Sequence, residues 1–193
     1  MKNNRPAPLA GLRVIESSLL GPAAITTHLA DLGAEVIKVE SPAGDYVREM
    51  TWPIINGVSL LHMHVNRGKK SVVLDLKVAE GAELYRELVR GADVVVEAMR
   101  PGSLERRGLG YEALREINPR IVFCNISGYG ATGPYSGLPA HGIAFDTWAG
   151  IVSPEIDDDG FCFLPEHASM GMHAGPLLGA LGILAGVLRA RES

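Results

Sequence analysis

Residues 9–40, LAGLRVIESSLLGPAAITTHLADLGAEVIKVE, decide the fold because they contain one complete strand, helix and strand unit. The apolar run at 12–15 predicts a short buried strand. Pro22 lies in a turn of small residues, where the first turn of a helix accepts proline, and apolar residues recur at helical spacing over 23–32. The β-branched run 34–40 predicts a second strand. We therefore expect a right-handed βαβ unit with parallel strands.

The same alternation continues along the chain. Further strands are predicted at 71–76, 92–97 and 120–126, and helices at 77–91, from Ser103, at 111–117, 138–150 and 174–191. A turn at 157–160 is predicted between two short extended pieces. This rhythm indicates an α/β fold: a doubly wound, mainly parallel sheet with helices on both faces.

Composition narrows the class of protein. The chain has 193 residues, of which 47% are hydrophobic and 21% charged, so one domain with a real core is expected. Its net charge is −4 and it has no basic run with interleaved aromatic residues, which argues against a nucleic-acid partner. The longest apolar stretch, 174–188, is broken by Gly and Pro and is shorter than about twenty residues, so a buried helix is favoured over a membrane span.

Two further features suggest a cytoplasmic protein. The first eight residues, MKNNRPAP, lack the apolar core of a signal peptide. Cys124 and Cys162 are expected to be reduced and structural, no metal-ligand spacing links them, and no metal is expected.

Two loops are candidate ligand sites. The glycine-rich loop 127–134, with Gly128 and Gly130, follows a predicted strand, and such a loop at the carboxyl end of a parallel strand is a common ligand site. The basic loop 66–70, with Lys69 and Lys70, adjoins another strand and suits an anionic ligand. The chain has neither GxGxxG in its first turn nor GxxxxGK[ST], so these patterns predict a site but no reaction.

Three stretches and a closing motif carry a family resemblance. They are LADLGAEVIKVESPAGDYVR (29–48), NRGKKSVVLDLK (66–77), GADVVVEAMRPGSLERRGLGYEALREINPRIVFCNISGYGATGPYSGLPAH (91–141) and GMH (171–173). Together they resemble the class III CoA-transferases, the family that includes carnitine-related CoA-transferases, formyl-CoA transferase and α-methylacyl-CoA racemase.

The resemblance implies a Rossmann-like large domain over residues 1–193, which is about the first half of a usual family chain. The family's small domain and returning C-terminal segment lie outside the sequence. The resemblance also implies acyl-CoA and carboxylic acid substrates. An interlocked homodimer, or a second chain that supplies the other half, is the implied assembly.

The resemblance also assigns CoA-binding positions. They are Leu19, Leu20, Gly21 and Pro22 in the first loop, Lys69 and Lys70 near the adenosine phosphate, Ala98 and Met99 after a strand, and Arg106 at the phosphates. Gly128 and Gly130, which follow the carboxyl end of a predicted strand, are expected to approach the thioester closely. Arg and Lys are the side chains that pair with phosphate. Ala98 replaces the family's usual asparagine and Leu19 a common polar residue, so these two contacts are lost or made by the backbone.

The implied catalytic positions depart from the family pattern. The transferases use an aspartate, four residues before the glycine of the closing motif, that attacks the thioester; here that position is His167, with Glu166 beside it. In the racemase branch a histidine, here His141, works with the later position. We therefore expect a CoA-transferase. The alternatives are an acyl-CoA α-proton racemase or isomerase that uses His141 and His167, and a catalytically degenerate CoA-binding subunit.

Overall fold

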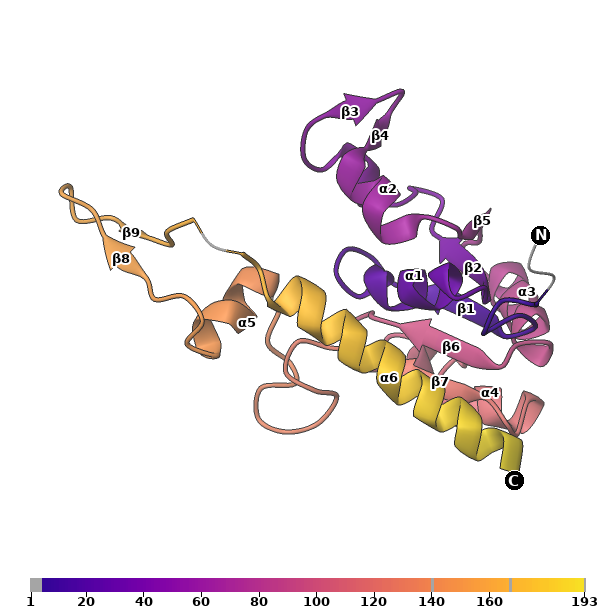
Figure 1. The fold of residues 1–193 in the computed structure, drawn as a ribbon. Coiled ribbons are helices and arrows are strands. Elements are labelled where there is room, and N and C mark those ends of the chain that lie inside the picture. The colour runs from indigo at the N-terminus through magenta and orange to yellow at the C-terminus, as the bar shows by residue number, and fades with distance from the viewer. Residues whose placement is uncertain (1–4, 140, 167, 193) are drawn as a thin grey trace.

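The computed structural model describes residues 5–139, 141–166 and 168–192 (Figure 1). Its centre is a five-stranded parallel sheet in the order β5-β2-β1-β6-β7. The strands are β1 (Arg13–Ser17), β2 (Glu35–Glu40), β5 (Lys70–Val73), β6 (Val94–Glu97) and β7 (Val122–Asn125). In this sheet Val14 pairs with Val36 on one side and with Val94 on the other. The predicted α/β fold with a parallel sheet is confirmed.

Helices cover both faces of the sheet. One face carries α1 (Ala23–Asp31) and α6 (Gly171–Glu192), and the other carries α3 (Ala79–Arg90) and α4 (Tyr111–Ile117). The core on the first side includes Leu12, Val14, Ile25, Leu29, Val36, Val94, Val96, Ile183 and Val187. The core on the second side includes Ile15, Ile37, Tyr85, Val89, Val95, Leu104, Leu109 and Leu114. Alternate residues of each strand thus enter opposite cores, as a doubly wound sheet requires.

Shorter elements connect these layers. They are η1 (Tyr46–Glu49), β3 (Ile54–Ile55), β4 (Val58–Ser59), α2 (Leu60–Asn66), η2 (Glu105–Arg107), α5 (Gly142–Trp148), β8 (Glu155–Ile156) and β9 (Cys162–Phe163). The β8 and β9 hairpin extends away from the sheet, as Figure 1 shows. It contains the predicted turn at 157–160.

Helix α6 packs very closely against α1 and β7. A Cβ atom at Gly179 would lie 2.8 Å from Cδ1 of Ile25, and one at Gly186 would lie 2.9 Å from Cγ1 of Val122. The glycines therefore permit the contact with α1 and β7. By length and composition α6 is also apolar enough to cross a membrane, and 22% of its most apolar window is buried.

Several predicted boundaries differ from the structure. The strand expected over 71–76 ends at Val73, because its partner strand β2 ends at Glu40, whose carbonyl accepts the N–H of Leu74. The helix expected from Ser103 is one 3₁₀ turn, since Gly102 and Gly108 on either side have positive φ angles of 76° and 65°.

The last two predicted helices also begin at other residues. Helix α5 begins at Gly142 rather than at 138, and the residue before Pro139 is disfavoured in helical conformation. Helix α6 begins at Gly171, three residues before the predicted start.

Candidate functional site

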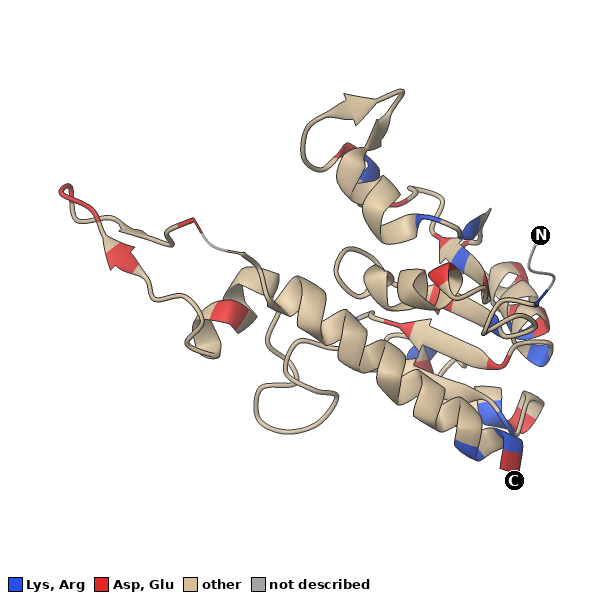
Figure 2. Cartoon of the chain, in the orientation of Figure 1, with Lys and Arg blue, Asp and Glu red and all other residues tan. Residues whose placement is uncertain are grey.

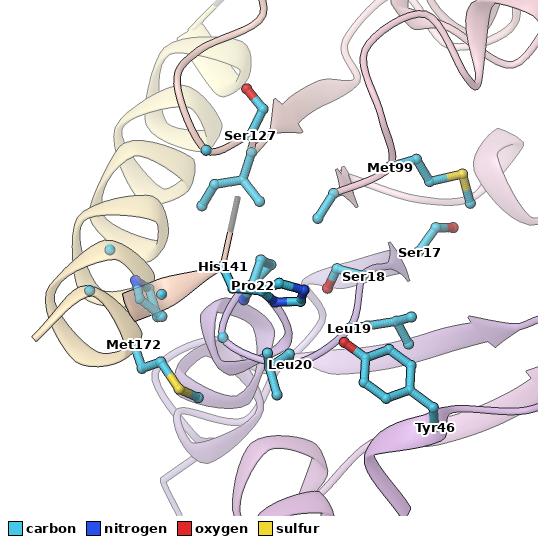
Figure 3. Close-up of a pocket in the computed structure, with 18 of the residues that line it drawn as sticks. Ser17, Ser18, Leu19, Leu20, Pro22, Tyr46, Met99, Ser127, His141 and Met172 are labelled. Atoms are coloured by element: carbon cyan, nitrogen blue, oxygen red, sulfur yellow. The ribbon is translucent and has the colours of Figure 1, made fainter. Parts of the chain in front are cut away.

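A cavity of about 620 Å³ lies at the carboxyl ends of β1, β2, β6 and β7 (Figure 3). Sequential strands run outward from β1 to β2 and β5, and the chain then returns to β6 on the other side of β1. Loops diverge from the sheet at such a reversal of strand order, and this is where doubly wound folds bind ligands. Helices α5 and α6 close the cavity with His141, Phe145, Met172 and Pro176.

The cavity brings together most of the predicted site residues. Leu19, Leu20, Gly21, Pro22, Ala98, Met99, Gly128 and His141 all line it. These residues come from loops after three different strands and from the start of α5. Lys69, Lys70, Arg106, Gly130 and Glu166 are not among its described lining residues. His167 lies outside the described residues.

Lys69 and Lys70 have different surroundings, although they are neighbours. The Lys69 side chain is buried, and its Nζ lies 2.7 Å from Oε2 of Glu16. Burial lowers the pKa of Lys69 to about 8, and the charge of Glu16 opposes this shift. Lys70 is the first residue of β5 and is exposed, with its Nζ 2.6 Å from Oε1 of Glu35. Because Glu35 is the first residue of β2, this contact holds the Lys70 side chain at the amino end of that strand, away from the cavity.

Arg106 lines a second, shallow hollow between η2 and the start of α3. Lys77, Arg86 and Arg107 share this hollow. Arg86 pairs with Glu83 at 3.0 Å. The hollow is lined by more basic than acidic side chains, which makes it suitable for an anionic group.

One long segment of the chain carries no Lys or Arg. Residues 121–188 contain no Lys or Arg. Figure 2 accordingly shows no blue on α5, on the β8 and β9 hairpin or on the first turns of α6. Any phosphate contact made by this chain through Lys or Arg must therefore come from segments outside 121–188.

Glu97 is a buried carboxylate at the end of β6 that the sequence reasoning did not single out. Its Oε2 accepts the N–H of Met99 at 2.8 Å, and its Oε1 accepts a hydrogen bond from the Asn125 side chain. Burial raises the pKa of Glu97. Because Met99 lines the cavity, Glu97 fixes the loop after β6 relative to β7.

Asp146 plays a similar part between α5 and α6. Its side chain is 1% exposed, Oδ1 accepts the N–H of Gly171 at 2.8 Å, and Oδ2 accepts the hydroxyl of Ser169 at 2.9 Å. Gly171 lines the cavity, as does His141 at the start of α5. Asp146 thus holds the segment after position 167 beside α5, which begins at Gly142 directly after His141.

An aromatic cluster attaches the glycine-rich loop to α5. The ring of Tyr129 lies 5.5 Å from Phe145 and 5.9 Å from Trp148, and Tyr135 lies 5.3 Å from Trp148, measured between centroids. Tilted and edge-on ring pairs at these distances are stabilising. The contacts of Tyr129 therefore hold the neighbouring Gly128 at the cavity wall. Among the described residues, no group of three or more His, Cys, Asp or Glu side chains is placed to hold a metal ion.

Comparison with known proteins agrees with this geometry. A family model described as CoA-transferase family III matches residues 9–193. The chain belongs to CoA-transferase family III. The class III resemblance drawn from the sequence is thereby confirmed.

Individual relatives have related names. The succinate–glutarate CoA-transferase of Agrobacterium fabrum is 43% identical over 166 residues, which cover 81% of this chain and 41% of that protein. The acetyl-CoA:oxalate CoA-transferase of Acetobacter aceti is 39% identical, over 96% of this chain and 48% of that protein. A solved CAIB/BAIF family protein from Brucella suis superposes with a TM-score of 0.85 at 35% identity, over 97% of this chain and 51% of that one. The chain spans about half the length of the curated relatives it matches.

Proposed function

We propose that the cavity binds the thioester end of an acyl-CoA and that the protein moves CoA from this thioester to a carboxylic acid. One observation carries the proposal: the loops after β1, β6 and β7, which are predicted to contact CoA, converge on a single cavity at the switch point of the sheet. Two of the relatives, the succinate–glutarate CoA-transferase and the acetyl-CoA:oxalate CoA-transferase, act on carboxylic acids by name and support the reaction.

The charge distribution indicates how CoA lies. Its phosphates need Arg or Lys, which are absent from residues 121–188 and concentrated in the hollow around Arg106. The apolar cavity, with its backbone-lined loops, suits the pantetheine arm. We therefore place the nucleotide toward Arg106, and the thioester toward Gly128, His141 and Met172.

The transfer requires a nucleophile, and the family resemblance places it just before α6. In the proposed reaction the Glu166 carboxylate attacks the thioester carbon, the carbon–sulfur bond breaks, and the CoA thiolate leaves as an acyl-glutamyl anhydride forms. The thiolate then attacks the glutamyl carbonyl to give an enzyme thioester and the free acid, and the second acid takes CoA by the reverse steps. His141 lines the cavity beside the proposed thioester site, and His167 occupies the position that the family resemblance gives to the nucleophile.

A second candidate is α-proton exchange on an acyl-CoA. The observation in its favour is that His141 lines the cavity, while the other residue of the racemase pair is also a histidine, His167. Imidazoles can take and return a proton near neutral pH. Incorporation of deuterium at the α carbon without any transfer of CoA would favour this reaction over the transfer.

We also propose that a second copy of the protein completes the assembly. Leu178, Leu181 and Leu188 of α6 are each more than 60% exposed, and exposed apolar faces of this size on a helix are commonly covered by protein. Light scattering of the purified protein at several concentrations tests this: a single mass equal to one protomer would contradict it. A cytoplasmic location remains a prediction.

Transfer is tested directly with succinyl-CoA and a set of dicarboxylic acids. New CoA thioesters are detected by mass spectrometry, and CoA binding is measured by calorimetry. Glu166→Gln should abolish transfer and the mass adduct on the peptide around Glu166, while CoA binding persists. Absence of CoA binding by the wild-type protein would refute the proposed function, and transfer by Glu166→Gln would refute the assignment of the nucleophile.

A further inference from the structure

The first loop, defined as residues 18–23, is held at both ends by buried lysines. Lys38 donates from Nζ to the carbonyl oxygen of Ser18 at 2.5 Å, and Lys69 donates to the carbonyl oxygen of Ala23 at 2.7 Å. Both side chains are only 2% exposed. The residues between these two anchor points line the cavity.

One carboxylate joins the two lysines. Oε1 of Glu16 lies 3.1 Å from Nζ of Lys38, and Oε2 lies 2.7 Å from Nζ of Lys69. Glu16 also accepts the hydroxyl of Ser18 at 2.9 Å and that of Thr26. A fully buried ion triad of this kind costs desolvation free energy and is kept in place only by good geometry and further hydrogen bonds.

Both ammonium groups have three partners each, and an ammonium group has three protons to donate. Lys69 reaches Glu16, the Ala23 carbonyl and, at 3.1 Å, Oδ1 of Asn66. Lys38 reaches Glu16, the Ser18 carbonyl and, at 3.2 Å, Oδ2 of Asp45. All donors are therefore used within the protein, which leaves none for a ligand phosphate.

The backbone between the anchors needs such support. Leu20 has a φ of +57°, in the left-handed region that residues with a side chain adopt only where the surrounding structure holds them. The Leu20 carbonyl also accepts the N–H of Ala23 at 3.0 Å, which begins α1. The left-handed conformation of the loop at Leu20 therefore depends on the two lysine contacts that hold its ends.

We propose that Lys38 and Lys69, joined by Glu16, are positioning residues that fix the first loop in the conformation that receives the ligand. This inference rests on the proposed binding of CoA for the nature of that ligand. It gives Lys69 a role beneath the loop in place of the phosphate contact suggested by the family resemblance.

The test compares two pairs of neutralising substitutions. Glu16→Gln/Lys69→Met removes the contact with Ala23 while the Lys38 and Asp45 charges still balance each other. The control, Asp31→Asn/Arg67→Met, neutralises an ion pair that joins the same 66–70 loop to the end of α1, but at an exposed site. Lys69→Arg, which keeps the charge but not the ammonium geometry, serves as a second variant if the first does not fold, as judged by circular dichroism.

Two quantities are measured on the purified protein. The first is amide hydrogen exchange of the peptide around residues 18–23 without ligand. The second is the affinity for CoA and for pantetheine, which has no phosphate. We expect exchange to be faster, and both affinities to be weaker by the same factor of about ten or more, the change expected from one lost charge-assisted hydrogen bond. The control variant should match the wild type.

Two results would overturn the proposal. One is unchanged exchange of the first loop. The other is a loss of CoA affinity without loss of pantetheine affinity, which would mean that Lys69 contacts a phosphate. If the wild type binds neither ligand, the proposed function fails, and the exchange measurement still decides the positioning role.

Discussion

Replacing Asp146 tests whether α5 and the start of α6 form one unit at the cavity. In Asp146→Ala the N–H of Gly171 and the hydroxyl of Ser169 lose a buried, charged acceptor. Hydrogen bonds to charged groups contribute about 1.5–3 kcal/mol each, so we expect the variant to lose about 3 kcal/mol of unfolding free energy. Asp146→Asn keeps one oxygen for Gly171 and an amide for Ser169, and should lose about 1 kcal/mol.

Urea unfolding followed by circular dichroism measures the change. With a slope of about 2 kcal/mol per molar urea, the midpoint for Asp146→Ala should fall by about 1.5 M. Asp158→Ala, at an exposed turn of the β8 and β9 hairpin, is the control and should leave the midpoint within about 0.3 M. The reasoning is refuted if the two variants have the same midpoint.

A double-mutant cycle isolates one of the two contacts. Ser169→Ala removes only the hydroxyl, so Asp146→Ala/Ser169→Ala should be more stable than the sum of the single losses predicts, by about 1 kcal/mol. Additive losses would show that the 2.9 Å contact contributes nothing. CoA affinity should fall in Asp146→Ala because Gly171 and Met172 line the cavity.

Three other predictions follow from single positions. Gly81→Ala should lose about 1–3 kcal/mol in urea unfolding despite alanine's better helix propensity, because its Cβ would lie 2.1 Å from the Asp75 carbonyl oxygen. A Cβ at Gly182 in α6 would meet nothing within 4 Å, so Gly182→Ala should raise the unfolding free energy. A Gly81→Ala variant more stable than Gly182→Ala would contradict the packing. The lowered pKa of Lys69, about 8 against its ordinary 10.5, means that the unfolded chain binds more protons between these pH values. The wild type should therefore gain up to about 3 kcal/mol relative to Lys69→Met as pH rises from 7 to 10.5, and a constant difference would refute this. Arg106→Gln should weaken the binding of CoA but not that of pantetheine, and an equal loss of affinity for both ligands would contradict this. Arg115→Gln, on the exposed side of α4, is the control.

The strands were predictable because buried parallel strands are continuous apolar runs with sharp ends. The unit at 9–40 matched β1, α1 and β2 within a residue or two, since burial on both faces leaves little choice of residue. The loops after β1, β6 and β7, which line the cavity, were predictable for the same reason: they begin where apolar runs end. Short helices such as η2 were not, because their length depends on backbone conformations at Gly102 and Gly108 that composition does not reveal.

The roles of charged residues were harder to predict than the fold. From the sequence, Lys69 and Lys70 form one basic pair, yet one is buried beside Glu16 and the other is exposed beside Glu35. Lys69 is the last residue of the loop and Lys70 the first residue of β5, and only three-dimensional packing shows which of the two meets a buried carboxylate. Glu97 could have been predicted as a cavity-edge residue, because it is the charged residue that ends the apolar run of β6 at the carboxyl edge of the sheet.

Buried charge in this chain is concentrated at the cavity. Among the residues that the structure describes, the Asp, Glu and Lys residues that are buried as whole residues are Glu16, Lys38, Glu40, Asp45, Glu97 and Asp146. Glu40 lines the cavity, and each of the others is next in sequence to a residue that does. Lys69, whose side chain is also buried, is not next to a lining residue and instead contacts Glu16. Buried charges are costly, and apolar replacements of a buried ion pair are often neutral or stabilising. A contribution to stability therefore does not account for this placement, whereas control over the position of the adjoining loops does. It follows that removing such a pair together should harm ligand binding more than it harms folding.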